Sequence, residues 1–204
     1  MEAGKTGVSN ITPEQILFGA GTIHKGLKYT KGTDEASGKF NFAESCKGAT
    51  SGGSKLSIVP EVYVPELDGV FVPTKGLKKK VGGKAVMEVN FAEVDQDTLK
   101  SSTYAVEGNS EDANYILLED SSDIPDDAYW DNVAFVGVTL EGKPIIAILD
   151  NALITNGFDN DFKNKEQLVG KFTFECHADL ATATTFDKLP WHIYWPKKAA
   201  QTAQ

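Results

Sequence analysis

The sequence predicts a mainly β fold, an antiparallel β-sandwich or half-barrel with one short flanking α-helix. Seven or eight segments with strand periodicity follow one another at short spacing, and only one segment carries the signals of a helix. Strands do not alternate with helices as they do in a parallel sheet. The chain has 204 residues, of which 41% are hydrophobic and 24% charged, as in an ordinary globular protein. We therefore expect a single domain that spans residues 1–204.

Two of the expected strands in the first half of the chain are irregular. Residues 16–27 form a strand interrupted by glycines, and residues 55–64 alternate in strand period. Pro60 lies within the second of these segments and cannot donate a hydrogen bond to a ladder. It therefore predicts a bulge or a position at the edge of a sheet.

A β-hairpin is expected over residues 68–94. Its strands are residues 68–81 and 84–94, and only Gly82 and Gly83 lie between them. Two adjacent glycines are a strong signal for a two-residue turn, because both positions then tolerate a positive φ.

The remaining elements follow from local pattern. Residues 95–102 predict the short helix, with Asp95 or Asp97 as its N-cap. Residues 133–149 contain two strands that are apolar on both faces, so we expect them at the centre of the sheet. Residues 170–180 alternate between apolar and polar side chains, which predicts a strand with one buried face.

Three segments are expected to reach beyond the body of the domain. They are an N-terminal arm at residues 1–14, a long loop at residues 28–54 that contains one short strand at residues 39–42, and a C-terminal arm at residues 186–204. Long loops and terminal segments of this kind are used by assembling proteins to contact their partners.

The charge pattern excludes one class of function. The chain has a net charge of −9, and all 20 of its basic residues are lysines. Arginine supplies the planar fork that reads guanine edges and grips phosphates, so a sequence-specific DNA-binding protein is not expected. The densest positive charge lies within residues 76–91, and residues 105–130 are acidic.

Few residues have the pattern of a catalytic or metal site. The glycine spacing of residues 18–26 resembles a phosphate loop, but neither the required Ser or Thr nor a helix follows, which favours a glycine-bent strand. Glu175, His177 and Asp179 share one strand face and are the candidates for a metal-dependent hydrolase, although no second ligand cluster lies nearby. The acidic residues near Asp120 lack the spacing of a calcium loop. We expect a protein that is not an enzyme and binds no metal or cofactor.

The cysteines and aromatic residues leave two expectations. Cys46 and Cys176 form no metal-binding spacing and are expected to be reduced thiols. Trp191, Tyr194 and Trp195 could dock on a neighbouring chain or core. As the alternative, they could form an aromatic platform of a β-sandwich module that binds carbohydrate.

Residues 50–100 carry an ordered series of motifs. The run TSGGSKLSIVPEVYVPELDGVFVPTKGLKKKVGGKAVMEVNFAEVDQDTLK contains a glycine-rich turn, a strand ending in a Pro-Glu bend, a DG turn, a KG strand, the double glycine and an AEV run that enters the helix. This pattern resembles the major tail tube proteins of long-tailed bacteriophages, particularly those that infect Gram-positive bacteria. It covers about a quarter of the chain. The motifs are structural, so no catalytic residue is carried over.

The resemblance implies a tube built from copies of this chain. Protomers form a hexameric ring whose inner sheets complete a continuous β-barrel, and stacked rings conduct the genome. The implied partners are other copies, the tape measure protein and tail-end proteins, with DNA only as passing cargo. The location is the virion tail after synthesis in the bacterial cytoplasm, because the first residues lack a signal-peptide core, and no membrane is involved. An acidic chain without arginine suits a lumen that must not bind DNA.

The same reasoning predicts the residues of the subunit interface. The lysine cluster is expected to pair with acidic residues of an adjacent subunit, which would fix register more than affinity. The expected interface residues are Lys78, Lys79, Lys80, Lys84, Asp120, Asp123, Asp126, Asp127, Trp191, Tyr194 and Trp195.

Overall fold

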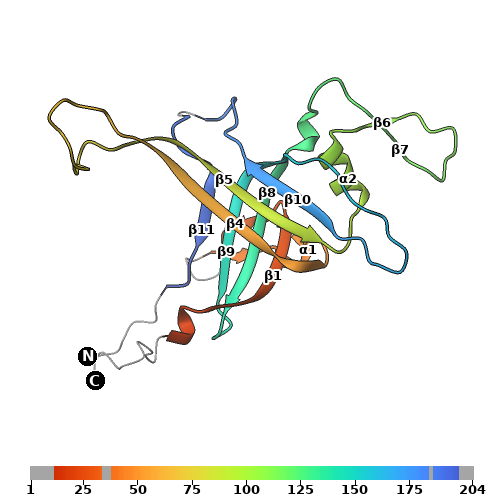
Figure 1. Cartoon of the computed structure of the whole chain (residues 1–204). Coiled ribbons are helices and arrows are strands. Elements are labelled where there is room, and N and C mark those ends of the chain that lie inside the picture. Colours follow the sequence, from red (N-terminus) through yellow and green to blue (C-terminus); the bar gives the residue numbers. More distant parts are fainter. Residues whose placement is uncertain (1–11, 34–37, 184–185, 198–204) are drawn as a thin grey trace.

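The main feature of the structure is a seven-stranded antiparallel sheet (Figure 1). The structure is a computed structural model that describes residues 12–33, 38–183 and 186–197. The strands of this sheet are β1 (Leu17–Lys25), β4 (Thr50–Tyr63), β5 (Lys79–Phe91), β8 (Trp130–Thr139), β9 (Pro144–Ile154), β10 (Gly170–Cys176) and β11 (Trp191–Tyr194). Their order is β1-β8-β9-β10-β5-β4, and β11 pairs with the first half of β9 while β10 pairs with its end. The prediction of a mainly β, antiparallel fold is confirmed.

Smaller elements complete the described chain. They are two ribbons, β2 (Tyr29–Thr30) with β3 (Lys39–Phe40) and β6 (Val106–Gly108) with β7 (Leu117–Glu119), and the helices η1 (Thr12–Glu14), α1 (Phe42–Ser45), α2 (Gln96–Thr103) and η2 (Asp126–Ala128). The expected helix is α2, and the carboxylate of Asp95 accepts a hydrogen bond from the Thr98 backbone N–H at 2.8 Å, which confirms the cap.

The segment 28–54 differs from the expected long loop. It contains β2, β3, the four-residue helix α1 and the first residues of β4. Its end is tied to β1 by a bridge between His24 and Cys46 and by a hydrogen bond from the Lys47 N–H to the Ile23 carbonyl at 2.9 Å. The short strand expected at residues 39–42 is present as β3, whereas β2 and α1 were not predicted because elements of two to four residues are too short for periodicity to be detected.

The core follows from alternation along the central strands. In β5 the buried side chains are Ala85, Met87, Val89 and Phe91, and in β10 they are Phe172, Phe174 and Cys176. Their polar neighbours, such as Glu88, lie on the opposite face. The expected alternation of residues 170–180 is therefore confirmed over β10.

The two central strands are buried on both faces, as their continuous apolar sequence predicts. Leu149 belongs to the main core, whereas Ile146 and Ile148 join a second cluster with Ala134, against which Phe42 packs. Both β8 and β9 thus have apolar neighbours on each side.

The expected hairpin turn at Gly82 and Gly83 is wrong. Strand β5 runs through both glycines and pairs with β4 along most of its length, so the connection is instead the loop at residues 64–78. A side chain at position 83 would place its Cβ 2.7 Å from the carbonyl oxygen of Val59 and 3.1 Å from the α-carbon of Pro60. The glycine therefore marks a close approach of the two backbones rather than a turn.

The prediction for Pro60 is confirmed. Strand β4 pairs only with β5 and lies at the edge of the sheet, and the register of the pair shifts between Glu61 and Val62. The missing N–H of Pro60 is therefore compatible with its position, and the bulge twists the outer part of the strand.

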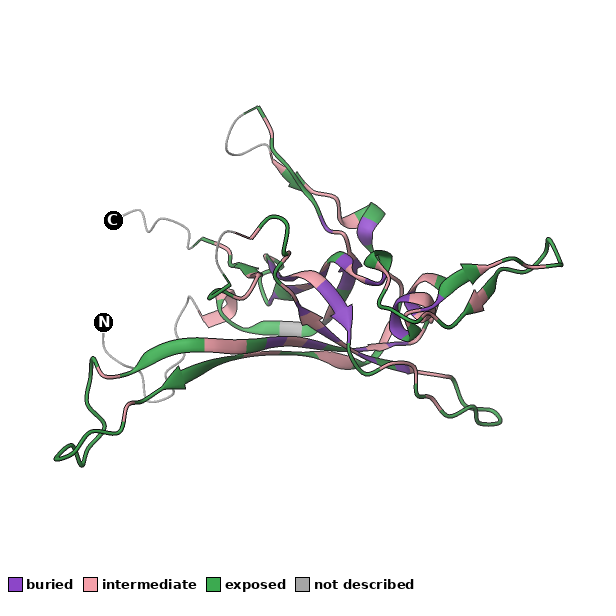
Figure 2. Ribbon diagram, turned by 90° about the horizontal axis from the view of Figure 1, so that it is seen from above, coloured by how far each residue is buried: buried purple, intermediate pink, exposed green. Residues whose placement is uncertain are grey.

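Several parts of the chain project from the buried centre (Figure 2). The outer half of the β4–β5 hairpin and the β6–β7 ribbon extend on opposite sides of the body, and their residues are mostly exposed. The buried residues concentrate where β1, β5, β8, β9 and β10 lie together. The outer part of the hairpin and the β6–β7 ribbon therefore bury few side chains.

Candidate assembly interface

The end of the β4–β5 hairpin is an exposed apolar surface. Its exposed hydrophobic residues are Val59, Val62, Tyr63, Val64, Leu67, Val70, Phe71, Val72 and Val81, and the Phe71 side chain is 94% exposed. Exposed hydrophobic side chains gathered on one projecting segment make that segment a candidate for contact with another surface.

The lysine cluster lies on the returning strand of the same hairpin. Residues 75–84 contain five lysines and no acidic residue. Lys79 and Lys80 pair in register with Tyr63 and Val62, near the start of β5. Within the described residues no ion pair is found for Lys78, Lys79 or Lys80, whereas Lys84 contacts Glu175 of its own chain at 2.9 Å. Three of the four predicted lysines are thus available to a partner.

The opposite end of the molecule is acidic. Residues 105–128, which contain the β6–β7 ribbon and η2, hold eight acidic residues and no lysine. Asp120, Asp123 and Asp126 are exposed and form no ion pair in the described part of the chain. Asp127 differs from them, because it binds Lys100 of its own chain at 2.8 Å.

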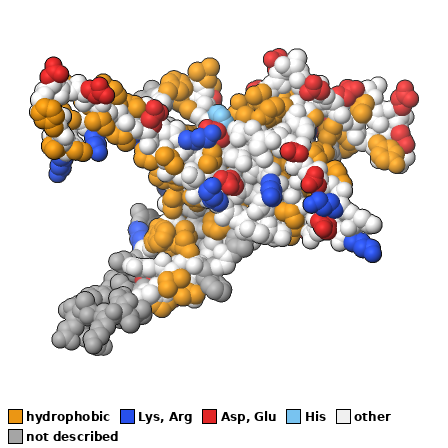
Figure 3. All heavy atoms as spheres, in the orientation of Figure 1, with side chains coloured by type: hydrophobic (Ala, Val, Ile, Leu, Met, Phe, Trp, Pro, Cys, Tyr) orange, Lys and Arg blue, Asp and Glu red, His pale blue; other side chains and the backbone are white. Residues whose placement is uncertain are grey.

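The basic and acidic ends cannot neutralise each other within one chain. The hairpin and the β6–β7 ribbon project to opposite sides of the sheet (Figure 1). In the space-filling view carboxylates lie at both ends, and lysines lie beside them at the hairpin end (Figure 3). The lysines of residues 75–80 and the carboxylates of residues 105–128 therefore lie on opposite sides of the sheet, while Glu66 and Asp68 lie at the hairpin tip itself.

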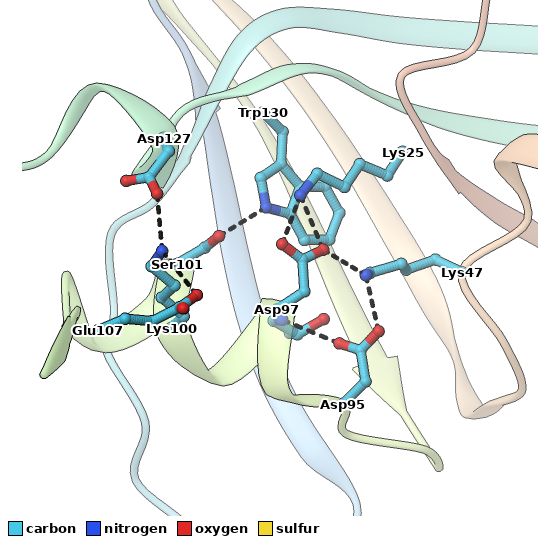
Figure 4. A network of polar contacts seen from close by, with 10 residues as sticks. Lys25, Lys47, Asp95, Asp97, Lys100, Ser101, Glu107, Asp127 and Trp130 are labelled. Atoms are coloured by element: carbon cyan, nitrogen blue, oxygen red, sulfur yellow. Dashed lines mark hydrogen bonds and ion pairs between the residues drawn. The ribbon is translucent and has the colours of Figure 1, made fainter. Parts of the chain in front are cut away.

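The acidic end is fixed to the sheet through α2 (Figure 4). Asp97 accepts hydrogen bonds from Lys25, with Nζ 2.7 Å from each carboxylate oxygen, and from Lys47 at 2.5 Å. The two ammonium groups lie over the ring of Trp130, at 4.8 Å and 5.3 Å from its centroid. The indole N–H of Trp130 donates to the Ser101 hydroxyl at 2.9 Å. The helix is thereby held by hydrogen bonds, ion pairs and cation–π contacts.

The ion pairs of this network lower the pKa values of its carboxylates. Burial acts to raise the pKa of Asp95, but hydrogen bonds from Lys47 and Thr98 outweigh burial and lower it below the ordinary value. Burial likewise opposes the shift at Asp97, and hydrogen bonds from Lys25 and Lys47 lower its pKa. Burial acts to lower the pKa of Lys47, but its two aspartate partners raise it. Asp95, Asp97 and Lys47 are therefore charged near neutral pH.

The three predicted aromatic residues do not share one platform. Trp191 packs against the main core, whereas Tyr194 and Trp195 line a groove together with Phe40 and Phe42. The pairing of β11 with β9 also shows that part of the expected C-terminal arm belongs to the main sheet. Sequence reasoning missed the groove, although the FNF run at residues 40–42 was a signal of apolar side chains in a polar segment.

The expected metal candidates are used within the chain. Glu175 pairs with Lys84, and Asp179 accepts hydrogen bonds from its own turn at Ala181 and Thr182, each at 2.8 Å. A search of the described residues finds no group of three or more His, Cys, Asp or Glu side chains that could hold a metal ion. His177 instead lies with Nδ1 3.0 Å from the Glu175 carbonyl.

The remaining sequence predictions concern glycine and cysteine. Residues 18–25 belong to β1, and a Cβ at Gly21 would lie 2.8 Å from the Val136 carbonyl oxygen, so the glycine permits a close approach of two strands.

Cys46 is exposed and Cys176 buried, and both are free thiols as expected. Burial raises the pKa of Cys176 to about 11, so this thiol is protonated near neutral pH.

Comparison with models of known protein families finds no match, and comparison with curated proteins finds none either. Among the helices of the described residues, none is long and apolar enough to cross a membrane.

Proposed function

We propose that this chain is a structural subunit of a bacteriophage tail tube, which assembles with copies of itself into stacked hexameric rings. The observation that carries the proposal is the separation of charge: a lysine-bearing hairpin and an acidic ribbon project from opposite ends of one chain. A surface that fits a different surface on an identical copy makes a head-to-tail contact. Such contacts close into rings or continue as filaments.

The resemblance to tail tube proteins supports this proposal independently. Residues 50–100 correspond to β4, the hairpin connection, β5 and the start of α2. The resembling motifs therefore include the projecting hairpin and the edge strand β4. An edge strand exposes unpaired backbone N–H and C=O groups. These groups promote aggregation of a monomer, but they let a subunit join its sheet to that of a neighbour.

The proposal includes the environment of the tube. The inner sheets of the ring would complete a β-barrel around a lumen, through which DNA passes as cargo without specific binding. The net charge of −9 and the absence of arginine suit this role, because each cationic contact to phosphate would add affinity and slow the passage of DNA. The tape measure and tail-end proteins are further proposed partners, the role is not enzymatic, and the location is the virion tail.

The proposal is tested by reversing the charge of the hairpin. Lys78, Lys79 and Lys80 are replaced together by glutamate, and assembly is followed by light scattering and negative-stain microscopy at high protein concentration. We expect rings or tubes from the wild-type chain and a loss of assembly in the variant, because the acidic ribbon of the next copy then meets glutamates.

A matched control keeps the change in net charge the same. Lys31, Lys171 and Lys188 are exposed and form no ion pair in the described part of the chain. Their replacement by glutamate should leave assembly intact. Persistent wild-type monomers, or equal loss of assembly in both triple variants, would contradict the proposal.

A further inference from the structure

An aromatic groove of about 420 Å³ lies on the body of the domain. Its main lining residues are Phe40, Phe42, Ile146, Tyr194, Trp195 and Pro196. Phe40 and Phe42 stack with their centroids 5.7 Å apart, and the ring of Tyr194 meets Phe40 edge-on at 5.2 Å. Two segments that are far apart in the sequence, residues 40–42 and 194–196, therefore bring these rings together, and Ile146 from a third segment also lines the groove.

The chemistry of the groove favours an apolar occupant. Among the described residues that line it, only Lys39, Tyr194 and Trp195 carry polar side-chain atoms, and no carboxylate or carboxamide is present. A sugar needs several such groups to replace the hydrogen bonds its hydroxyls make with water. A hydrophobic or aromatic side chain needs none, and it gains from the burial of apolar surface.

The tip of the β4–β5 hairpin presents side chains of this kind. Leu67, Phe71 and Val72 are 50%, 94% and 69% exposed. The tip is ordered by its own turn, in which the Val70 N–H donates to the Leu67 carbonyl at 3.2 Å and the Thr74 hydroxyl to the Val72 carbonyl at 3.1 Å. A preorganised apolar tip loses little conformational entropy when it binds.

The charges around the two surfaces are complementary. Glu66 and Asp68 are exposed beside the tip, and Lys39 and Lys197 are exposed beside the groove. None of these four side chains forms an ion pair with the described residues. Opposite charges at the rim of an apolar contact steer the partners and fix their register.

We propose that the hairpin tip of one copy docks in the aromatic groove of another copy, with Phe71 among the rings. This inference rests on the proposed self-assembly and names a second contact, distinct from the contact between the lysines and the acidic ribbon. No residue of the tip lines the groove of its own chain. The contact therefore joins two different surfaces of identical copies and is open-ended, so it can link successive copies.

Cross-linking between two separately purified variants tests this contact. Both carry Cys46→Ser to remove the exposed native thiol, and one adds Val72→Cys at the tip while the other adds Lys39→Cys at the groove. Phe71 and the aromatic rings are left in place. We expect a disulfide-linked heterodimer when the two are mixed under mild oxidation, in preference to either homodimer.

Two controls make the result specific. Leu180→Cys replaces Lys39→Cys, because Leu180 is 85% exposed but does not line the groove, and it should not cross-link to the tip. Adding Phe71→Asp to the tip variant should lower the yield of heterodimer by about tenfold or more, as expected for the loss of a central apolar anchor.

The outcomes separate this inference from the proposed function. Assembly into rings or tubes without the heterodimer overturns the docking of the tip and leaves self-assembly standing. Failure of the wild-type chain to assemble under any condition removes both. A third outcome is that no heterodimer forms and the protein binds anionic phospholipid vesicles in a way that requires Phe71. This result would assign the tip to a lipid surface and would also overturn the inference.

Discussion

Trp130 lies at the centre of the polar network that joins helix α2 to the main sheet. It is fully buried, its indole N–H is satisfied by Ser101, and the ammonium groups of Lys25 and Lys47 lie over its ring. The carboxylate of Asp97 holds both lysines in place. Trp130 thus links strand β8 to helix α2. Its hydrogen bond to Ser101 involves two neutral groups, whereas the lysines over its ring are held by the charged carboxylate of Asp97.

The carboxylates of this network predict a loss of stability in acid. The pKa values of Asp95 and Asp97 are lowered in the folded state, so their stabilisation is complete above the ordinary aspartate pKa of about 3.9 and is lost as pH falls through the lowered values. Lys47 has a raised pKa, so its contribution is lost only as strongly alkaline pH is reached. We expect Asp97→Asn to lower the free energy of unfolding at pH 7 by about 1 kcal/mol, a small value because the side chain is partly exposed.

Urea unfolding at pH 7 and pH 3 checks this expectation. The difference in stability between the two pH values should be smaller in Asp97→Asn than in the wild type, since one titrating group has been removed. Asp161→Asn is the matched control, because the Asp161 side chain is 85% exposed and 3.8 Å from its lysine partner. An identical acid effect in all three proteins would show that the network does not contribute to acid sensitivity.

At the scale of elements, the predictions that succeeded depend on local pattern. The cap of α2, the alternation of β10 and the apolar strands β8 and β9 each follow from side chains within one segment. The prediction of a turn at Gly82 and Gly83 was wrong, because it used only the local sequence, whereas these glycines are explained by a contact with another strand. Pro60 on the neighbouring strand approaches Gly83 closely. Pro60 lies outside residues 68–94, so the sequence of that segment alone does not predict this contact.

This explanation of Gly83 gives a prediction for the hairpin. Gly83→Ala should destabilise the β4–β5 pair by about 1–3 kcal/mol, because its Cβ would meet the backbone of Val59 and Pro60, which cannot move without disturbing the ladder. Thermal unfolding measures the global effect, and hydrogen exchange of β4 amides measures the local one.

The neighbouring glycine provides the control for this substitution. A Cβ at Gly82 would lie 3.3 Å from the flexible Glu61 carboxylate, which can turn aside. Gly82→Ala should therefore be tolerated better than Gly83→Ala. Equal effects at both positions would show that these glycines matter for backbone freedom rather than for the close approach.

At the scale of the whole molecule, the placement of the charged segments was beyond sequence reasoning. The lysine cluster and the acidic segment were both visible in the sequence, but their positions at opposite ends of the fold depend on the strand order. The aromatic groove was also missed, because Phe40, Ile146 and Tyr194 come from strands far apart in the chain. Sequence patterns specify elements, whereas surfaces built from several elements require the topology.

A head-to-tail contact between hairpin and ribbon predicts complementation between two inactive variants. The first variant carries Lys78→Glu, Lys79→Glu and Lys80→Glu, and the second carries Asp120→Lys, Asp123→Lys and Asp126→Lys. Asp127 is left unchanged, because it binds Lys100 of its own chain and its loss would disturb α2. In the first variant the hairpin glutamates meet the native carboxylates of the next copy, and in the second the native hairpin lysines meet the lysines introduced at positions 120, 123 and 126, so we expect neither to assemble alone.

In the mixture, every contact between unlike copies is attractive. The glutamates of the first variant face the lysines introduced in the second, and the native lysines of the second face the native carboxylates of the first. Alternating copies should therefore assemble, as seen by light scattering and by negative-stain microscopy, and added salt should weaken this assembly because the charges are exposed. Assembly of either variant alone, or its absence in the mixture when the wild-type chain assembles, would show that these charges do not form the contact between subunits.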